Sequence, residues 1–233
     1  MKRMFMLMSL ALMIGAAMAL SGVAQAKSNS ASPDAKCAKQ ASAKLGKGFD
    51  PSGYTFVGGT AGDDNFDGKA TTGPDVFCGF DGANSIYTLD AGDIFLGGDG
   101  TDSVTTNNGT FNGGLGVDSV GTNNGTFNGQ ADNDSVSFQN YGTFNGGLGV
   151  DSVIGNQEGS TFNGEADDDY VSGNAGTYNG GDGNDYLEYN FAVGTFNGDA
   201  GDDHLEYNTG TFDGGAGTDT FGTNDGGTLV NVP

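Results

Sequence analysis

The stretch GTFNGGLGVDSV occurs twice without change, at Gly109–Val120 and again at Gly142–Val153, and looser copies surround both. Each copy contains a carboxylate, Asp118 or Asp151, that follows a run of glycines. From Phe95 onward the chain repeats on an aromatic residue every 16 to 18 positions. Self-similarity of this kind predicts an array of small stacked units rather than one conventional globular core.

The spacing inside each repeat is fixed. An Asp follows the aromatic by seven positions, an apolar residue follows that Asp by two, and an Asn follows it by five, with Gln139 in this place in one unit. Length varies only in the connection to the next aromatic. Because a disordered glycine-rich tract has no reason to keep one half constant, the pattern predicts a solenoid. The aromatic starts are Phe56, Phe77, Phe95, Phe111, Phe127, Phe144, Phe162, Tyr178, Phe196 and Phe212.

Each unit has the pattern of two short strands joined by two turns. One strand carries the Val or Leu of sequences such as DSV, and the other carries the aromatic of GTF. Single apolar residues flanked by polar ones fit the period-two alternation of a strand. Units stacked about 4.8 Å apart would form two facing parallel sheets. We therefore expect an all-β chain, a parallel β-roll or two-sheet β-solenoid of about 10 coils.

The turn GGLGVD, Gly113–Asp118, has the composition of a cation site. Glycines permit left-handed backbone angles and allow carbonyl oxygens to converge, and the Asp adds a charged oxygen. Calcium takes six to eight oxygen ligands, which two stacked turns can supply together although one turn cannot. The pattern predicts several Ca²⁺ ions in a file along one edge of a calcium-stabilised solenoid.

Three nine-residue stretches, GGDGTDSVT (Gly97–Thr105), GGDGNDYLE (Gly180–Glu188) and GGAGTDTFG (Gly214–Gly222), match the pattern G-G-x-G-x-D-x-U-x in full. GTAGDDNFD (Gly59–Asp67) and GDAGDDHLE (Gly198–Glu206) are near matches. The chain thus resembles the RTX, or haemolysin-type, calcium-binding repeat family over residues 56–222. The resemblance implies a parallel β-roll with calcium in its turns.

The repeats depart from this family pattern in two ways. After Asp102 only every second turn keeps the glycine-acid sequence, so ions are expected along one edge. The turns GQADND (129–134) and GEADDD (164–169) carry acids in place of glycines. The candidate metal ligands are Gly59, Gly62, Asp64, Asp75, Asp93, Gly98, Gly100, Asp102, Gly114, Gly116, Asp118, Asp132, Asp134, Gly147, Gly149, Asp151, Asp167, Asp169, Gly181, Gly183, Asp185, Gly201, Asp203, Gly215, Gly217 and Asp219.

Charge supports the cation hypothesis independently. The formal net charge is -22, and every Lys and Arg lies at or before Lys69, whereas 25 of the 30 acidic residues follow it. Such a chain repels nucleic acid and anionic membrane. A column of Asp side chains about 5 Å apart repels by roughly 1 kcal/mol per neighbouring pair in bulk water. We therefore expect calcium binding to be coupled to folding.

The N-terminal residues 1–26 have the layout of a secretory signal peptide: a basic start, an apolar stretch and the ending Ala24-Gln25-Ala26. An uncleaved anchor helix is the alternative. We expect a secreted, extracellular protein with no membrane insertion after cleavage, a segment at 27–55 that can cap the array, and repeats over 56–233. In an exported protein Cys37 and Cys78 are expected to form a disulfide, with two free thiols as the alternative.

The sequence predicts a non-enzymatic calcium-binding protein with a scaffold or attachment role and an unidentified cell-surface or matrix ligand. Only residues 27–55 precede the array, and the single histidine, His204, replaces Ser, Tyr or Thr of other repeats. No catalytic residue is assigned. Two alternatives are an ice-binding solenoid that uses the Thr-x-Asn ladder of the GTFN sequences, and a calcium-dependent polysaccharide-acting enzyme.

Overall fold

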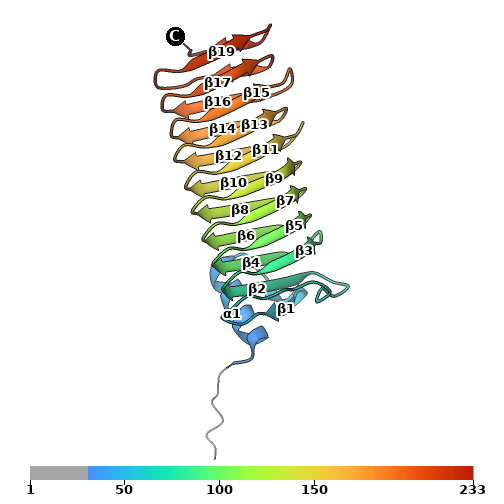
Figure 1. Ribbon diagram of the computed structural model, residues 1–233. Helices are drawn as coiled ribbons and strands as arrows, with labels where there is room; N and C mark the ends of the chain where they lie inside the picture. The colour runs from blue at the N-terminus through green and yellow to red at the C-terminus, as the bar shows by residue number, and fades with distance from the viewer. Residues whose placement is uncertain (1–30, 233) are drawn as a thin grey trace, which may run out of the picture. The chain divides into compact units, whose positions relative to one another are not determined.

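The computed structural model describes residues 31–232, and residues 55–230 form a parallel β-solenoid of about ten turns (Figure 1). The predicted all-β, two-sheet architecture is confirmed. One sheet has 11 strands and the other has nine, and every pairing between neighbouring strands is parallel. The expected signal peptide, residues 1–26, lies outside the described residues.

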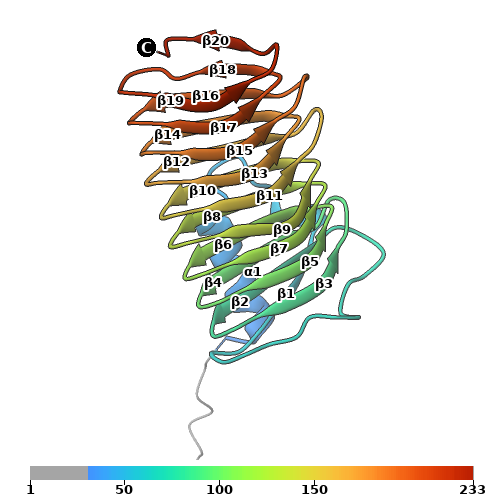
Figure 2. The ribbon, with the colours of Figure 1, turned by 45° about the horizontal axis from the view of Figure 1, so that its top comes forward.

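From β2 onward, successive strands alternate between the two sheets, as Figure 2 shows from a second direction. Sheet A contains β1 (Thr55–Gly58), β2 (Asp75–Asp81), β4 (Ile94–Asp99), β6 (Thr110–Leu115), β8 (Thr126–Ala131), β10 (Thr143–Leu148), β12 (Thr161–Ala166), β14 (Thr177–Asp182), β16 (Thr195–Ala200), β18 (Thr211–Asp213) and β20 (Thr228–Val230). Sheet B contains β3 (Ser85–Leu89), β5 (Ser103–Asn107), β7 (Ser119–Asn123), β9 (Ser135–Asn140), β11 (Ser152–Asn156), β13 (Tyr170–Asn174), β15 (Tyr186–Asn190), β17 (His204–Asn208) and β19 (Thr220–Asn224).

The core is a row of aromatic rings from sheet A facing a row of Val, Leu and Ile side chains from sheet B. From Phe95 to Phe212 the rings stack face to face, with centroids 4.6 to 5.1 Å apart. Within this run the rings are 0% exposed. Because one coil holds only one residue of each row, each ring depends on the coils above and below for its burial.

Two positions differ from the sequence-based alignment. Val57, not Phe56, pairs with Phe77, so Phe56 lies outside the ring stack and packs in a second cluster beneath the N-terminal helix. In β9 a bulge adds one residue, and Asn140 rather than Gln139 pairs with Asn123 and Asn156. The extra residue is accommodated because its side chain lies on the solvent side of sheet B.

The N-terminal segment forms helix α1 (Pro33–Lys44) and a short 3-10 turn, η1 (Pro51–Gly53). Cys37 forms a disulfide with Cys78 of β2, which confirms that expectation. The helix covers outward-facing apolar side chains at the start of sheet A, including Val76 and Leu96. No helix within residues 31–232 has the length and apolar character required to cross a bilayer.

Replacement of a stacked ring will test the core. We predict that Phe144→Ala, between Phe127 and Phe162, lowers the free energy of unfolding by about 3–5 kcal/mol, because the truncated ring leaves a cavity. Phe138 is 67% exposed on β9 and provides the control, with Phe138→Ala expected to change stability by less than about 1 kcal/mol. Denaturant unfolding followed by circular dichroism measures both; equal losses would contradict the ring-stack core.

Candidate functional site

The solenoid has two chemically different edges. At the edge that we term the acid edge, turns run from the end of a sheet A strand to the start of the next sheet B strand, as between β6 and β7. At the opposite asparagine edge, turns return from sheet B to sheet A. Asp118 and Asp151, the carboxylates of the duplicated stretch, both lie at the acid edge.

Eight aspartates form a continuous column inside the acid edge. The backbone N–H of each member before Asp219 donates to Oδ1 of the member one coil further along, as from Asp118 to Asp134, with N–O distances of 2.6 to 3.0 Å. All are at most 2% exposed. This aspartate column consists of Asp102, Asp118, Asp134, Asp151, Asp169, Asp185, Asp203 and Asp219.

The second carboxylate oxygen of every column member has no partner. All eight Oδ2 atoms are buried and have no hydrogen-bond partner among residues 31–232. The buried Tyr178 hydroxyl lies beside Asp185 and is likewise without a partner within hydrogen-bond distance. Each Oδ2 atom lies where the first glycine of its turn would carry a side chain, so a Cβ at Gly113 or Gly146 would overlap the carboxylate of Asp118 or Asp151. The first glycine of each turn is therefore required because its missing side chain makes room for the column carboxylate. The sequence analysis did not assign a role to this glycine in the column turns.

Backbone carbonyls surround the same small space. A Cβ at Gly164 would also meet the carbonyl oxygen of Gly180 in the next coil, and Gly198 has the same relation to Gly214. A carboxylate oxygen and a carbonyl oxygen thus face one space, and no hydrogen bond within residues 31–232 satisfies the carboxylate oxygen. Uncompensated burial of a charged oxygen is costly, so this arrangement fits either a bound cation or a proton on the acid.

Burial raises the pKa of seven of the column aspartates. Burial, reinforced by neighbouring carboxylates, raises the pKa of Asp118, Asp151 and Asp169 to about 8. Burial likewise raises the pKa of Asp134 and Asp185 to about 7. Burial raises the pKa of Asp102 and Asp203 to about 6. The accepted backbone hydrogen bonds act in the opposite direction but are outweighed.

The later glycines of each turn supply the backbone geometry. Gly114 and Gly116 have φ values of 126° and 105°, and a Cβ at Gly116 would overlap the Gly100 carbonyl of the preceding coil. Side chains at these positions would be strained. The predicted ligand glycines with positive φ are Gly98, Gly100, Gly114, Gly116, Gly147, Gly149, Gly181, Gly183, Gly201, Gly215 and Gly217.

Acids that replace glycines have a separate role. Asp132 and Asp167 adopt positive φ, and their carboxylates lie outside the column. Asp132 Oδ2 accepts the N–H of Gly116 at 2.9 Å, and Asp167 Oδ2 accepts that of Gly149 at 3.0 Å. These aspartates therefore tie their coil to the preceding one, a contact that the sequence analysis did not foresee.

The remaining predicted ligands lie before the column. Gly59 and Gly62 lack the left-handed backbone of the later glycines, and Asp64 Oδ2 accepts hydrogen bonds from Thr60. Asp75 and Asp93 lie at the asparagine edge, where the N–H of Asp75 donates to Asp93 Oδ1 at 2.9 Å. The predicted set is thus divided between the column and these N-terminal turns.

The asparagine edge is lined by amides instead of acids. Asn107 Nδ2 donates to Asn123 Oδ1 and to the Thr126 carbonyl, and this pattern continues coil by coil to Asn208. Each buried amide acts as both donor and acceptor. This edge is satisfied within the protein, in contrast to the aspartate column.

No group of three or more His, Cys, Asp or Glu side chains in residues 31–232 is placed to hold a metal ion by side chains alone. A cation at the acid edge would therefore need backbone carbonyls or water besides the carboxylates, as calcium sites commonly use. Comparisons of the chain with family models, with curated proteins and with solved structures find no match.

The raised pKa values predict how the metal-free protein depends on pH. In the folded state they exceed the usual 3.8, so protons bind the folded state more tightly. The resulting stabilisation is complete below about pH 4 and is lost as pH rises through 6 to 8. In chelator, the melting temperature should fall between about pH 5 and pH 8, as measured by circular dichroism.

Two comparisons make this pH experiment selective. Asp151→Asn removes one titrating column member and should flatten the profile, whereas Glu158→Gln, at an exposed loop position, should leave it unchanged. A melting temperature that rises over the same pH interval in chelator would contradict a column of buried, proton-stabilised acids.

Proposed function

We propose that this chain is a secreted, non-enzymatic calcium-binding solenoid whose folding is stabilised by several Ca²⁺ ions at the acid edge. The carrying observation is the column of eight buried Oδ2 atoms without a donor. The column aspartates and nearby glycine carbonyls would hold the ions. Bound calcium would supply the positive charge that offsets carboxylate burial and repulsion.

Charge distribution favours a cation over protons at neutral pH. Several column members have pKa values of about 7 or 8, so protons alone neutralise the column only partly near pH 7. No Lys or Arg follows Lys69, and the positive charge must therefore come from solution. The resemblance to RTX repeats supports calcium as that ion.

A scaffold or attachment role agrees with the surroundings of the acids. The column aspartates are at most 2% exposed, and this burial supports a binding role over direct contact with a substrate. His204 is engaged with Glu206 and Thr220 on the surface of sheet B. We propose extracellular placement from the secretory layout of residues 1–26, because calcium is abundant outside cells.

The test is a calcium titration of the full chain and of Asp151→Asn. In the coil before that of Asp102, the equivalent position is occupied by Asn84, whose N–H donates to Asp102 Oδ1 and whose Oδ1 accepts the N–H of Asp64. An amide is therefore tolerated at this position. We predict that wild type binds several ions and gains β-structure, and that Asp151→Asn binds fewer with weaker affinity. Calorimetry gives the stoichiometry and circular dichroism gives the folding response.

Glu158→Gln removes one exposed carboxylate from the loop that precedes β12 and serves as the control. It should leave stoichiometry and affinity unchanged. A stoichiometry near zero or one for the wild-type chain would overturn the proposal. A full β-sheet spectrum at neutral pH in excess chelator would separate calcium binding from folding and contradict the coupling.

Ice binding is the second candidate, favoured by the outer face of sheet A. Thr143, Asn145 and their equivalents are half-buried on either side of the inward aromatic. The Asn side chains of six consecutive coils form one hydrogen-bonded row on this face. The result is a regular, uncharged array of Thr and Asn on an otherwise acidic protein.

For this candidate we predict that the wild-type chain shows thermal hysteresis and that Thr143→Lys abolishes it, because a long charged side chain disrupts the flat face. Thr122→Lys, on sheet B, is the matched control and should retain the activity. Thermal hysteresis measured on the folded proteins decides the question; no hysteresis in the wild type excludes this function.

A further inference from the structure

The outer row of asparagines on sheet A is directional. Nδ2 of each residue after the first donates to Oδ1 of the one in the preceding coil, at 2.7 to 2.8 Å. All the amide N–H groups that form these bonds therefore point toward the N-terminal coils. We term this row the outer ladder; its members are Asn112, Asn128, Asn145, Asn163, Asn179 and Asn197.

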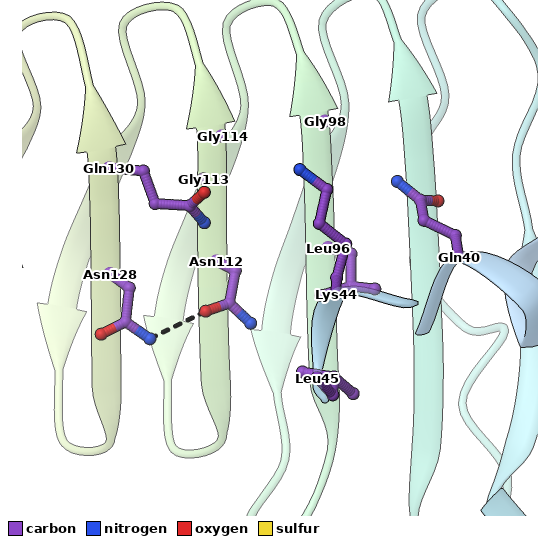
Figure 3. Close-up of a pocket in the computed structure, with 10 residues that line it drawn as sticks. All are labelled: Gln40, Lys44, Leu45, Leu96, Gly98, Asn112, Gly113, Gly114, Asn128 and Gln130. Carbon is purple, nitrogen blue, oxygen red and sulfur yellow. Dashed lines mark hydrogen bonds between the residues drawn. The ribbon is translucent and has the colours of Figure 1, made fainter. Parts of the chain in front are cut away.

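The outer ladder ends in a free donor. The residue that pairs with Asn112 in the preceding strand is Leu96, which offers no side-chain acceptor. Asn112 Nδ2 consequently donates to no acceptor within residues 31–232, and Figure 3 shows it directed toward the side chains of Lys44 and Leu96. Aligned amides polarise one another, so the donor end of such a chain carries partial positive charge, as a helix N-terminus does.

A pocket of about 240 Å³ lies at this donor end, between the C-terminal turn of α1 and the outer face of sheet A (Figure 3). Leu45 and Leu96 contribute apolar surface, and Gln130 presents its amide from the opposite side. Lys44 adds an ammonium group from the last turn of the helix. The disulfide between Cys37 and Cys78 fixes α1 on this sheet and thereby maintains the pocket.

The chemistry of this pocket is opposite to that of the rest of the molecule. The Lys44 ammonium and the amides of Asn112 and Gln130 supply hydrogen-bond donors to one cavity, whereas the coils beyond Lys69 contain no Lys or Arg. Gln40 also lines this cavity, and its buried Oε1, which has no hydrogen-bond partner among residues 31–232, can accept from a ligand hydroxyl. Figure 3 shows the Lys44 ammonium beside Gly98 and the Asn112 amide on the side of Leu45, so the two donors line different parts of one pocket. A cation and an amide donor on one pocket favour a carboxylate, and charge-assisted hydrogen bonds to it are the strong ones.

We propose that the pocket binds the carboxylate of a single sugar-sized ligand, a hexuronate, either free or at the end of an acidic glycan. Its volume lies near the lower limit of small-molecule pockets. The carboxylate would accept from Lys44 and Asn112, and Leu45 and Leu96 would contact the C–H groups of the sugar ring.

The far end of the outer ladder provides an internal contrast. Asn197 pairs with Asp213, and Asp199 lines the same surface, so the acceptor end of the row faces carboxylates. An anion is disfavoured there. Only the N-terminal end combines a free amide donor with a cation, and the proposal therefore predicts one carboxylate site per chain.

The experiment titrates the full chain with sodium D-glucuronate and with D-glucose as the neutral match, at fixed calcium concentration, by calorimetry or NMR. We expect glucuronate to bind with a stoichiometry of one and glucose to bind at least about tenfold more weakly. Lys44→Met should weaken glucuronate binding about tenfold, and Asn112→Leu about fivefold.

Lys36→Met removes an equal charge from the exposed side of α1 outside the pocket and should leave affinity unchanged. Circular dichroism and the melting temperature establish that each variant is folded. Equal affinity for glucose and glucuronate, equal losses from Lys36→Met and Lys44→Met, or no binding of glucuronate would each overturn the proposal. Oligomers ending in glucuronate distinguish a glycan terminus from the free sugar by their higher affinity.

Discussion

The backbone-to-carboxylate hydrogen bond of the aspartate column is the constraint on which the acid edge depends. It fixes the register of one turn on the next by joining the N–H of Asp118 to the carboxylate of Asp134. It also holds the side chain inside the coil, and the first glycine must then lack a Cβ. Because this bond uses only Oδ1, it leaves a buried oxygen that needs a cation or a proton.

The two edges show why one is self-sufficient and the other is not. A carboxamide is both donor and acceptor, so a column such as Asn123, Asn140 and Asn156 satisfies itself from coil to coil. An ionised carboxylate only accepts. In a stack of aspartates, a backbone N–H therefore satisfies one oxygen of each carboxylate. The other oxygen cannot be satisfied by another aspartate of the stack, however well the coils pack.

The repeat spacing was sufficient to predict the stacked coils, the two facing rows of the core and the placement of acids at one edge, since these follow from periodicity alone. It could not distinguish Gln139 from Asn140, because both can occupy that spacing and only the ladder bonds to Asn123 and Asn156 select one. The interpretation of Asp132 as a ligand overlooked its bond to Gly116. The pocket under α1 depends on contacts between segments distant in sequence, which no local pattern encodes.

The contacts of Asp132 and Asp167 make two coils the unit of construction. Each copy of GTFNGGLGVDSV is followed by a coil whose acid binds back to it, through Gly116 in one case and Gly149 in the other. A pair can therefore be added or removed while its neighbours keep the same bonds. Each pair lengthens the molecule by about 9.6 Å, two strand spacings. The length of the solenoid is therefore set by the number of coil pairs, and its two ends can remain unchanged.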